Sequence, residues 1–343
     1  METVLVTGGS GFIGSHICIS LIANKYNVLI IDSLVNSTLD NFKNLKNIIE
    51  FKAVDLSEKI KFLKGDLRNK FWLDKVFSDY ERKRKPIKFV IHLAGLKSIS
   101  SSFDYPLEYW DMNVNSSISL FSVMLKYNCL NLVFSSSATV YKPKENYLIN
   151  EDDTVAPITP YGKTKFAIEE ILKDVFICNK GLRVVNLRYF NPVGAHKSGL
   201  ICENPKDKSN NLFPAIIKVL KKEQVKLKIF GRDWPTKDGT CVRDYIHVMD
   251  LADAHIAALN YIISGKPKII NLNIGTGIGT SVLEIIKKFE ELNSTTLAYE
   301  FVERRVGDQG FLVANNKLAL KLLNWKPRRN LIDICRDTIS SHF

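Results

Sequence analysis

A tyrosine and a lysine four residues apart, Tyr161 and Lys165, are the first candidates for chemistry in this chain of 343 residues. On a helix, this spacing puts both side chains on one face. An ammonium group beside a phenol favours the phenolate and brings its pKa of ~10 towards neutrality, so that the tyrosine can act as a base. Upstream, Ser135-Ser136-Ser137 ends an expected strand with hydroxyls that can share a substrate proton. Because this spacing also occurs on exposed helix faces, its meaning depends on the rest of the chain.

A glycine-rich turn near the N-terminus supplies that context. Gly8, Gly11 and Gly14 form a variant of the dinucleotide fingerprint, directly after the first expected strand and at the start of a helix. Glycines let the backbone approach a pyrophosphate, and the helix offers free N–H groups and its positive dipole end. Asp32 ends the next expected strand, where a carboxylate binds the adenosine ribose and repels a 2′-phosphate. The pattern predicts NAD binding, with a tight structural turn as the alternative.

Short apolar runs separated by helical patterns must position these groups. Continuous apolar strands alternating with helices indicate a parallel sheet covered on both faces. The right-handed crossover rule then favours an α/β fold with a doubly wound parallel (Rossmann) sheet. The expected strands are Thr3–Thr7, Val28–Ile31, Ile60–Lys64, Phe89–Leu93, Leu132–Ser135 and Leu182–Leu187, and two expected crossover helices are Gly14–Asn24 and Pro106–Tyr127.

The regular alternation of apolar strands and helical patterns ends after about Asn191. The polar stretch His196–Asn211, with its Lys-Asp-Lys cluster, predicts a long loop. A helix over 212–222, a strand over 226–230 and a helix over 250–263 are expected to follow. We therefore predict an NAD-binding Rossmann domain over 1–190 and a second, smaller α/β substrate-binding domain, mainly over 191–343. Part of 235–265 is expected to pack back on the first domain.

Composition excludes several classes of protein. Hydrophobic residues make up 45% and charged residues 24% of the chain, which is typical of a globular protein and not of a disordered one. The six scattered cysteines and six histidines show no ligand spacing, so we expect no metal site and no disulfide scaffold. No secretory leader and no apolar run of ~18 residues is visible, which predicts a cytoplasmic protein without a membrane partner.

The net charge of +12 is the one unusual number. Nucleic acid, a membrane surface, an anionic substrate or a generally lysine-rich surface would each account for it. The densest basic run, Arg82-Lys83-Arg84-Lys85, contains no aromatic residue of the kind that nucleic-acid-binding surfaces use. We therefore expect no nucleic-acid partner.

Together these motifs resemble the extended short-chain dehydrogenase/reductases, and longer matches resemble the UDP-glucose 4-epimerases (UDP-galactose 4-epimerases) of that family. The matches follow one another along nearly the whole chain. They are TGGSGFIGSH at 7–16, GDLRN at 65–69, HLAGLKS at 92–98, SSSATVY at 135–141, YGKTK at 161–165, LRYFNPVGAH at 187–196, NNLFP at 210–214, DGTCVRDYIHVMDLADAH at 238–255 and RRVGD at 304–308.

The resemblance implies a role for individual residues. Tyr161 would be the active-site base, Lys165 its partner and a ligand of the nicotinamide ribose, and Ser137 a bridge to the sugar 4-hydroxyl. The implied cofactor-binding residues are Gly8, Gly11, Phe12, Ile13, Gly14, Asp32, Asn36, Ser37, Asp66, Leu67, Leu93, Ala94, Gly95, Lys97, Asn113, Ser135, Tyr161, Lys165 and Tyr189. The implied substrate-binding residues are Lys97, Ser137, Tyr161, Asn191, Asn211, Leu212, Phe230, Arg243, Arg305, Asp308 and Leu312.

Two of the substrate positions have alternative interpretations. Arg243 and Arg305 converging on a diphosphate would require the second domain to fold over the first, and arginine forks suit that ligand. For Arg243, a salt bridge with the neighbouring Asp244 is the alternative. For Phe230, core packing is favoured over contact with a ligand.

The resemblance also implies an activity. Tyr161 would remove the 4-hydroxyl proton of UDP-glucose or UDP-galactose while hydride passes from C4 to bound NAD, and the 4-keto sugar would turn over before hydride returns. Sugar-nucleotide 4,6-dehydratases carry an acid pair just after the strand-end position, where this chain has Ala138-Thr139, so an epimerase is favoured. A homodimer is expected from the resemblance alone.

Some alternatives stay open. Leu312 aligns with the wall of the sugar pocket and is intermediate in size, so UDP-N-acetylglucosamine and UDP-N-acetylgalactosamine are also candidate substrates. A UDP-uronate 4-epimerase and a non-catalytic NAD-binding regulator are the other candidates. A second glycine-rich turn, Gly275-Thr276-Gly277-Ile278-Gly279, lacks the fingerprint spacing and predicts a structural turn.

Overall fold

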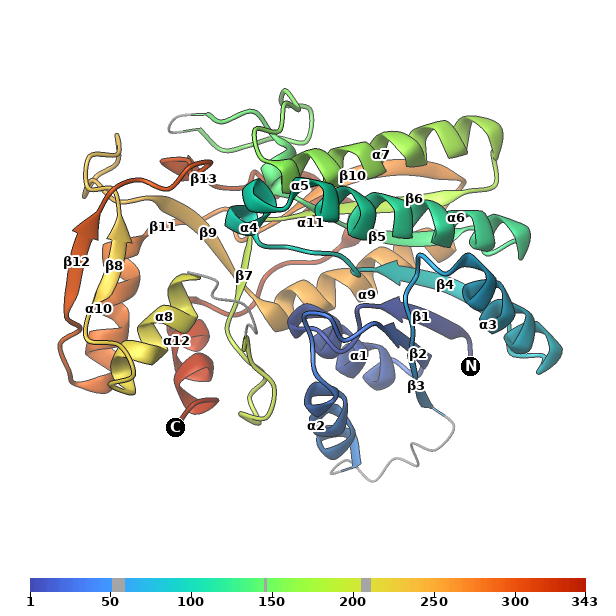
Figure 1. Cartoon of the computed structure of the whole chain (residues 1–343), viewed down its shortest axis with the longest axis horizontal. Helices are drawn as coiled ribbons and strands as arrows, with labels where there is room; N and C mark the ends of the chain where they lie inside the picture. Colours follow the sequence, from blue (N-terminus) through green and yellow to red (C-terminus); the bar gives the residue numbers. More distant parts are fainter. Residues whose placement is uncertain (51–58, 145–146, 205–210) are drawn as a thin grey trace.

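The computed structural model describes residues 1–50, 59–144, 147–204 and 211–343 (Figure 1). Seven parallel strands form its main sheet, in the order β10-β6-β5-β4-β1-β2-β3. The chain runs outward from β1 to β3 and then returns to the other side of β1, so that the winding direction reverses between β1 and β4. This topology confirms the predicted doubly wound α/β fold. The strands are β1 (Thr3–Thr7), β2 (Asn27–Asp32), β3 (Ile60–Lys64), β4 (Ile87–His92), β5 (Asn131–Ser137), β6 (Arg183–Tyr189) and β10 (Lys268–Ile274).

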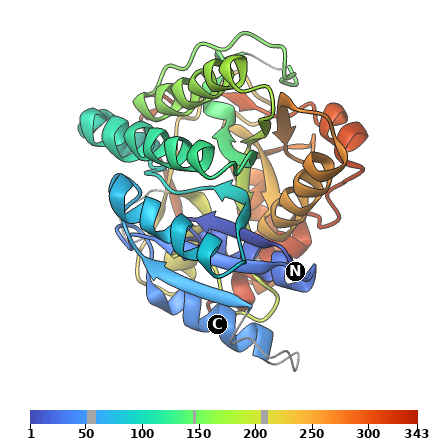
Figure 2. The same cartoon turned by 90° about the vertical axis from the view of Figure 1, so that its right-hand side faces the viewer.

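Helices cover both faces of this sheet because its strands carry apolar side chains on both sides. In β1, Val4 and Val6 face one hydrophobic core and Leu5 faces the other. Figure 2 shows the green α7 and the teal α6 on one side of the sheet and the orange α9 on the other. The first core contains α1 (Phe12–Ala23), α2 (Leu39–Glu50), α9 (Val248–Ser264) and α11 (Lys317–Leu323), and the second contains α3 (Lys70–Arg82), α6 (Ser116–Lys126) and α7 (Pro160–Cys178).

The segment predicted as one helix over Pro106–Tyr127 is interrupted. Short helices α4 (Ile99–Asp104) and α5 (Pro106–Tyr109) lead into a π-helical turn, η1 (Trp110–Asn115), and only then into α6. A π-helical turn shifts the residues after it around the helix axis, and such turns occur frequently at functional sites. Here the turn contains Asn113, whose side chain is buried.

A separate core gathers the second half of the chain, at the left of Figure 1. Phe213, Tyr245 and Phe289 pack their rings together there, with ring centroids 5.4–5.5 Å apart. The elements are α8 (Leu212–Leu220), β8 (Leu227–Phe230), α10 (Val282–Asn293), β12 (Tyr299–Val302) and α12 (Leu331–Ser340), with a smaller sheet of β7 (Asn191–Val193), β9 (Val242–His247), β11 (Gly279–Ser281) and β13 (Phe311–Leu312). In the predicted loop His196–Asn211, residues 205–210 with the Lys-Asp-Lys cluster lie outside the described residues.

The chain crosses between the two cores more than once. The predicted return over 235–265 covers α9, and β10 and α11 lie beyond that range but also pack on the main sheet. Strand β10 does so because it is apolar on both faces, with Ile269 in one core and Leu272 in the other. The second half of the chain therefore supplies the edge strand of the first sheet.

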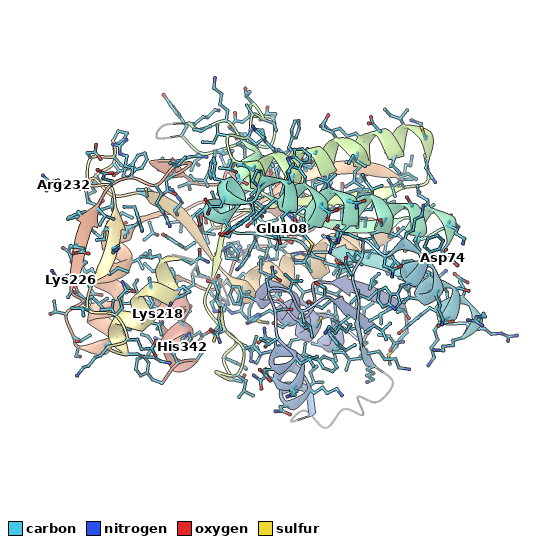
Figure 3. All side chains as sticks on the ribbon, viewed as in Figure 1. Asp74, Glu108, Lys218, Lys226, Arg232 and His342 are labelled. Atoms are coloured by element: carbon cyan, nitrogen blue, oxygen red, sulfur yellow. The ribbon has the colours of Figure 1, made fainter. Side chains whose placement is uncertain are left out.

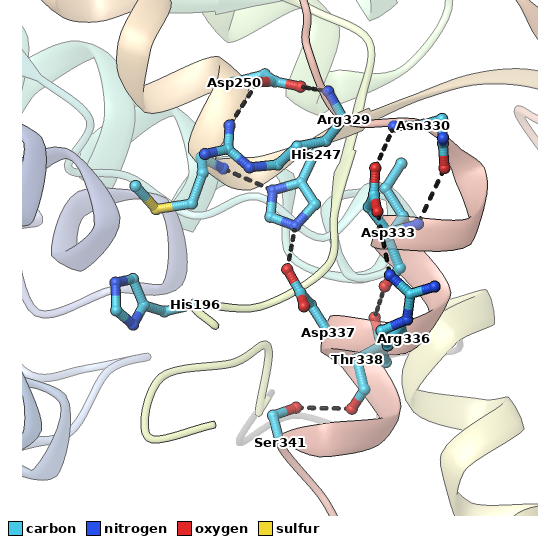
Figure 4. A network of polar contacts seen from close by, with 12 residues as sticks. His196, His247, Asp250, Arg329, Asn330, Asp333, Arg336, Asp337, Thr338 and Ser341 are labelled. Atoms are coloured by element: carbon cyan, nitrogen blue, oxygen red, sulfur yellow. Dashed lines mark hydrogen bonds and ion pairs between the residues drawn. The ribbon is translucent and has the colours of Figure 1, made fainter. Parts of the chain in front are cut away.

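A polar network joins α12 to the start of α9, where the two cores meet (Figure 4). His247 accepts from the backbone N–H of Met249 through Nδ1 (3.0 Å) and donates from Nε2 to Asp337 (3.1 Å). Asp250 accepts from the guanidinium of Arg329 at 2.5 Å. Burial and the nearby Arg329 lower the pKa of His247, so the imidazole is neutral and its tautomer matches both bonds. The network anchors the C-terminal helix without a charged histidine.

The outer surface is basic. Figure 3 labels Lys218, Lys226 and Arg232, which are exposed on the second half of the chain. Among the residues that the structure describes, no helix is long and apolar enough to cross a bilayer, and no group of His, Cys, Asp or Glu is arranged to hold a metal ion.

Candidate active site

The glycine turn between β1 and α1 leaves no room for side chains. A Cβ on Gly14 would lie 2.3 Å from the carbonyl oxygen of Gly8, and Gly8 has φ +71°. Gly11 precedes the helix and caps it with no side chain. The first N–H groups of a helix have no partner within it, so Phe12, Ile13 and Gly14 present donors and the positive dipole end. This bare turn fits the pyrophosphate of a dinucleotide.

Asp32 ties the glycine turn to the loop after β2. Its Oδ2 accepts from the N–H of Ser10 (3.0 Å), and its Oδ1 accepts from the N–H of Leu34 (2.9 Å) and the hydroxyl of Ser37 (2.7 Å). A carboxylate offers about four acceptor positions. One position therefore remains for a ribose hydroxyl, while the buried negative charge still opposes a 2′-phosphate.

A pocket opens beside Asp32 at the carboxyl ends of β1, β2 and β4, where the winding direction reverses. Ligands of doubly wound folds bind at this point. The predicted residues among those that line it are Gly8, Asp32, Asn36, Asp66, Leu67, Ala94 and Gly95. The residues that the sequence analysis missed are Ile31, Ser33, Val35, Gly65, Leu96, Met112 and Ser116.

Asn113 holds the loop that forms one wall of this pocket. Its Oδ1 accepts from the N–H of Leu96 (2.7 Å), and its Nδ2 donates to the carbonyl of Leu96 (3.1 Å) and to Oγ1 of Thr164 on α7 (3.0 Å). A Cβ on Gly95 would lie 2.7 Å from Oδ1. The π-helical turn thus connects the loop containing Leu93–Lys97 to α7 through the side chain of Asn113.

The three predicted catalytic residues converge at the ends of β5 and α7. Tyr161 is the second residue of α7, whose first turn is capped by Thr159, and Lys165 follows one turn later. Ser137 is the last residue of β5. Its Oγ accepts from the N–H (3.2 Å) and the hydroxyl (3.0 Å) of Thr139. The same hydroxyl is near enough to the phenol of Tyr161 to favour its ionised form, so Ser137 is oriented by Thr139 and acts on Tyr161.

Burial sets the protonation of this group. It raises the pKa of Tyr161 to about 12, although the bond with Ser137 opposes the shift, and it lowers the pKa of Lys165 to about 8. Lys165 Nζ donates to the carbonyl of Ser135 (2.8 Å) and lies 5.9 Å from the centre of the Tyr161 ring. In the chain alone, desolvation is therefore the largest effect on both groups, and the lowering of the tyrosine pKa by Lys165 stays a prediction.

Tyr189 is buried at the end of β6 beside this group. Its hydroxyl bonds to Nε2 of His255 on α9 (2.5 Å), and Nδ1 of that histidine bonds to the carbonyl of Leu251 (2.8 Å). Burial raises the pKa of the phenol, although the nearby Ser135 hydroxyl opposes the shift. A neutral hydroxyl is therefore fixed between the sheet and α9.

The second half of the chain brings a cationic group towards this edge. Asp308 accepts from Nε of Arg305 (3.0 Å) and lies 3.9 Å from Nη2 of Arg243. The guanidinium of Arg305 stacks over the ring of Phe230, 4.3 Å from its centroid. The two arginines thus meet at one carboxylate, and the alternative pairing of Arg243 with Asp244 is wrong because Asp244 bonds elsewhere. Two guanidinium groups on separate segments suit a diphosphate.

A glutamate that the sequence analysis missed joins the two halves of the site. Oε1 of Glu203 accepts from Nζ of Lys97 (2.9 Å) and from Nδ2 of Asn211 (2.8 Å). Lys97 belongs to the predicted cofactor set and Asn211 to the predicted substrate set. No local pattern marks Glu203, because Lys97 lies 106 residues away and Asn211 lies 8 residues away.

The other predicted substrate residues lie between these groups. Asn191 begins β7, and its Oδ1 is buried without a hydrogen-bond partner among the described residues. Leu212 is the first residue of α8. Leu312 is 8% exposed and packs in an apolar cluster with Ala138 and Phe190, next to Ser137 in the chain. The amide oxygen of Asn191 can accept a hydrogen bond from a polar ligand. The apolar wall at Leu312 would hold the part of the ligand beside it less tightly, because it offers no hydrogen bonds.

Known proteins match this chain over nearly its full length. The model of the NAD dependent epimerase/dehydratase family matches residues 4–275. The chain belongs to this family. The bifunctional UDP-glucose 4-epimerase and UDP-xylose 4-epimerase 3 of Arabidopsis thaliana is 43% identical over 337 residues, covering 98% of this chain and 94% of that relative.

Solved structures of epimerases have the same fold. The UDP-glucose 4-epimerase of Stenotrophomonas maltophila, with bound NAD and formylated UDP-arabinopyranose, matches with a TM-score of 0.93 and 40% identity, covering 100% of this chain and 98% of that one. That of Bifidobacterium longum, in complex with NAD+ and UDP, matches with a TM-score of 0.91 and 39% identity, covering 99% and 98%. The predicted family resemblance and fold class are confirmed.

In this epimerase/dehydratase family member, the second glycine-rich turn wraps a carboxylate of the chain itself. Oδ1 of Asp244 accepts from the N–H and the hydroxyl of Thr276 (both 2.7 Å), and Oδ2 accepts from the N–H groups of Gly277 (2.9 Å) and Ala314 (3.2 Å). A Cβ on Gly275 would lie 2.4 Å from Oδ2. The predicted structural turn is thus an anion cradle that ties β9 to the segment after β13.

A chain of hydroxyl and imidazole groups under the cofactor pocket was also missed. Thr7 Oγ1 accepts from the N–H groups of Leu93 and Ala94 (both 3.2 Å), so its proton points to Nδ1 of His92 (2.7 Å). Nε2 of His92 then donates to Ser117 Oγ (2.9 Å). Burial, with the charge of Lys165 adding, lowers the pKa of His92 to about 3, which keeps the imidazole neutral. This family member therefore fixes its pocket loop through one histidine tautomer.

Proposed function

We propose that the protein interconverts UDP-glucose and UDP-galactose by oxidation and re-reduction at C4 of the sugar, with NAD as its cofactor. The observation that carries the proposal is the convergence of Ser137, Tyr161 and Lys165 beside a dinucleotide pocket. The similar epimerases, aligned over 98% of this chain, support the same activity.

NAD, when bound, supplies a hydride acceptor for C4 and, in its oxidised form, a positive charge. The bare glycine turn would hold its pyrophosphate, and the remaining acceptor position of Asp32 would take a ribose hydroxyl. Tyr161 would accept the proton of the sugar 4-hydroxyl, and the Ser137 hydroxyl beside it would relay that proton. Because burial raises the pKa of Tyr161 to about 12, its phenolate needs a nearby positive charge, and Lys165 one turn away can contribute one.

The two ends of the substrate would be held differently. Arg243 and Arg305 would bind the diphosphate as charge-assisted forks, whereas Leu312 and its apolar neighbours offer the sugar no fixed hydrogen bonds. A firmly held diphosphate and a loosely held sugar allow a 4-keto sugar to present its other face. This is what epimerisation requires.

The residues after Ser137 disfavour a dehydratase. Ala138-Thr139 forms a 3-10 turn in which Thr139 bonds back to Ser137. Elimination of the 6-hydroxyl would require an acid and a base at this point of the sugar, and neither residue can act as either. The site therefore supports epimerisation within the family.

Turnover of UDP-galactose by the purified protein tests the proposal. UDP-glucose should accumulate, and Tyr161→Phe should lower kcat at least a thousandfold while UDP still binds. The neighbouring Lys163→Ala, an exposed position on the same helix, is the matched control and should retain full activity. No turnover by the unmodified protein, or equal turnover by the Tyr161→Phe variant, would refute the proposed function.

A wider substrate range is a second candidate, favoured by Leu312. This side chain is smaller than an aromatic ring, and it belongs to a cluster of apolar side chains, so an N-acetyl group has a neighbour that can repack. We propose that UDP-N-acetylglucosamine and UDP-N-acetylgalactosamine are also interconverted. Leu312→Tyr should abolish turnover of the acetylated pair and retain that of UDP-galactose. No turnover of the acetylated pair by the unmodified protein would refute this extension.

We also propose a cytoplasmic homodimer. The face formed by α5, η1 and α6 exposes Leu107 (82%), Trp110 (40%) and Ile118 (45%), an apolar group that a second copy would cover. All six cysteines are free thiols, which fits a reducing compartment. Sedimentation should give a mass near 78 kDa, twice the 39.0 kDa of the chain, and Leu107→Asp with Ile118→Asp should halve it. A monomer at micromolar concentration would contradict the dimer.

A further inference from the structure

A buried ion pair lies behind the catalytic side chains, between α7 and β6. Arg188 donates from Nε to Oε1 of Glu169 (3.0 Å) and from Nη2 to Oε2 (2.6 Å). The two side chains are 2% and 0% exposed. Ser136 donates its hydroxyl to the same carboxylate (2.5 Å). The carboxylate is therefore neutralised in one orientation by a bidentate fork and a hydroxyl.

Glu169 follows Lys165 by four residues on α7. Side chains at this spacing lie on one helix face with Cβ atoms about 5–6 Å apart, and a lysine and a glutamate placed so form ion pairs. Both side chains are buried, so a Glu169 without Arg188 would be a desolvated charge with an ammonium one turn away. Lys165 instead donates to the carbonyl of Ser135 (2.8 Å).

We propose that Arg188 is a positioning residue whose bidentate bond to Glu169 prevents that carboxylate from capturing Lys165, so that Lys165 stays beside Ser137 and Tyr161. The three consecutive serines at the end of β5 each contact a different residue of α7, so the register of β5 determines which residue each serine meets. The carbonyl of Ser135 accepts from Lys165, the hydroxyl of Ser136 donates to Glu169, and the hydroxyl of Ser137 acts on the phenol of Tyr161. The effect on turnover rests on the proposed function, but the contact between Lys165 and Ser135 does not.

The other titratable groups near Lys165 are neutral. Tyr161 on α7 and Tyr189 on β6 are phenols whose pKa values are raised by burial. His92 on β4 has its pKa lowered to about 3 by burial, with the charge of Lys165 contributing. Tyr109 on α5 faces Tyr161 and opposes its ionisation. In this set Glu169 carries the negative charge that can compete for Lys165.

The guanidinium of Arg188 has two further partners besides Glu169, and both are lost when Arg188 is replaced. Nη1 of Arg188 donates to the hydroxyl of Tyr141 (2.8 Å) and to the carbonyl of Glu151 (3.2 Å). Tyr141 in turn donates to Asn273 (2.7 Å). Removing Arg188 therefore also has a structural cost, and the test must separate that cost from the capture of Lys165.

A double variant makes this separation. Arg188→Met should lower kcat at least tenfold with KM changed less than threefold, because Glu169 then pairs with Lys165. Adding Glu169→Gln should restore kcat to within threefold of the unmodified protein, because the amide keeps the bond from Ser136 but has no charge. A double variant as slow as Arg188→Met, or an Arg188→Met variant with normal kcat, would overturn the proposal.

The protonation of Lys165 gives a readout that does not depend on turnover. Acylation of Lys165 with acetic anhydride, followed by mass spectrometry across pH, should show a midpoint at least one pH unit higher in Arg188→Met and a normal midpoint in the double variant. If Arg188→Met does not fold, Arg188→Lys takes its place in the experiment. This variant keeps a cation but loses the bidentate bond, so its midpoint should be intermediate. Equal midpoints in every folded variant would refute the proposal, whereas an inactive unmodified protein with the expected shifts would refute only the proposed function.

Discussion

Replacing Asp244 by asparagine tests how β9 is attached to the second glycine-rich turn and to the segment after β13. An asparagine keeps one oxygen towards the two donors of Thr276 but turns an amide N–H₂ towards the N–H groups of Gly277 and Ala314. Each buried donor left without an acceptor costs about 1–3 kcal/mol. Burial raises the pKa of Asp244, so the neutral amide recovers part of this cost through easier desolvation. We expect Asp244→Asn to lose about 3 kcal/mol of unfolding free energy.

Urea denaturation, followed by circular dichroism, measures this loss, and titration with UDP measures the effect on the site. UDP affinity should fall about tenfold. The reason is that Arg243, a predicted diphosphate ligand, directly precedes Asp244, and that Asp244 also bonds to Ala314 in the segment after Leu312. The control Thr276→Val removes one hydroxyl donor and should cost about 1 kcal/mol. An Asp244→Asn variant within about 0.5 kcal/mol of the unmodified protein would show that the cradle does not hold the two segments together.

Three further predictions follow from the site. Gly14→Ala should purify without NAD, because its Cβ would lie 2.3 Å from the carbonyl oxygen of Gly8. The NAD content is measured by the absorbance of a perchloric acid extract. An unchanged NAD content would contradict a role of this glycine turn in binding the pyrophosphate. The buried Lys165 ammonium, whose pKa falls from 10.5 to about 8, destabilises the nucleotide-free protein by about 3 kcal/mol below pH 8, and this cost disappears between pH 8 and 10.5. The stability of Lys165→Met relative to the unmodified protein should therefore decline between pH 7.5 and 9.5 in urea melts, and a constant difference would exclude the shift. Arg305→Lys should weaken UDP binding about tenfold in calorimetry, because lysine cannot stack flat on Phe230 or bind a phosphate with a fork; equal affinity would remove Arg305 from the site.

Local patterns predicted the first half of the site well. Strands β1 and β3 lie where the apolar runs placed them, and Gly8, Gly14 and Asp32 meet at the carboxyl edge because a parallel sheet brings all strand ends to one side. The arrangement of Tyr161 and Lys165 on one helix face follows from helical periodicity alone. These features depend on residues that are close in sequence or on sheet topology.

The features that sequence reasoning missed depend on distant pairs. Asp244 accepts from Ala314, 70 residues away, and Arg188 on β6 pairs with Glu169 on α7. No sequence pattern marks the π-helical turn that buries Asn113, because the segment Pro106–Tyr127 has the pattern of one continuous helix. The effect of Lys165 on the pKa of Tyr161 stays a prediction, because spacing gives proximity but not desolvation, and burial by itself raises that pKa.

The central claim is that hydride leaves C4 of the sugar and returns to the same carbon within the protein. Its most direct test is to incubate the purified protein with UDP-galactose in D₂O, without added NAD, and to analyse the product by proton NMR. The mechanism predicts UDP-glucose that still carries ordinary hydrogen at C4, because NAD bound to the protein takes up that hydrogen and gives it back. Deuterium at C4, or no UDP-glucose at all, would contradict it.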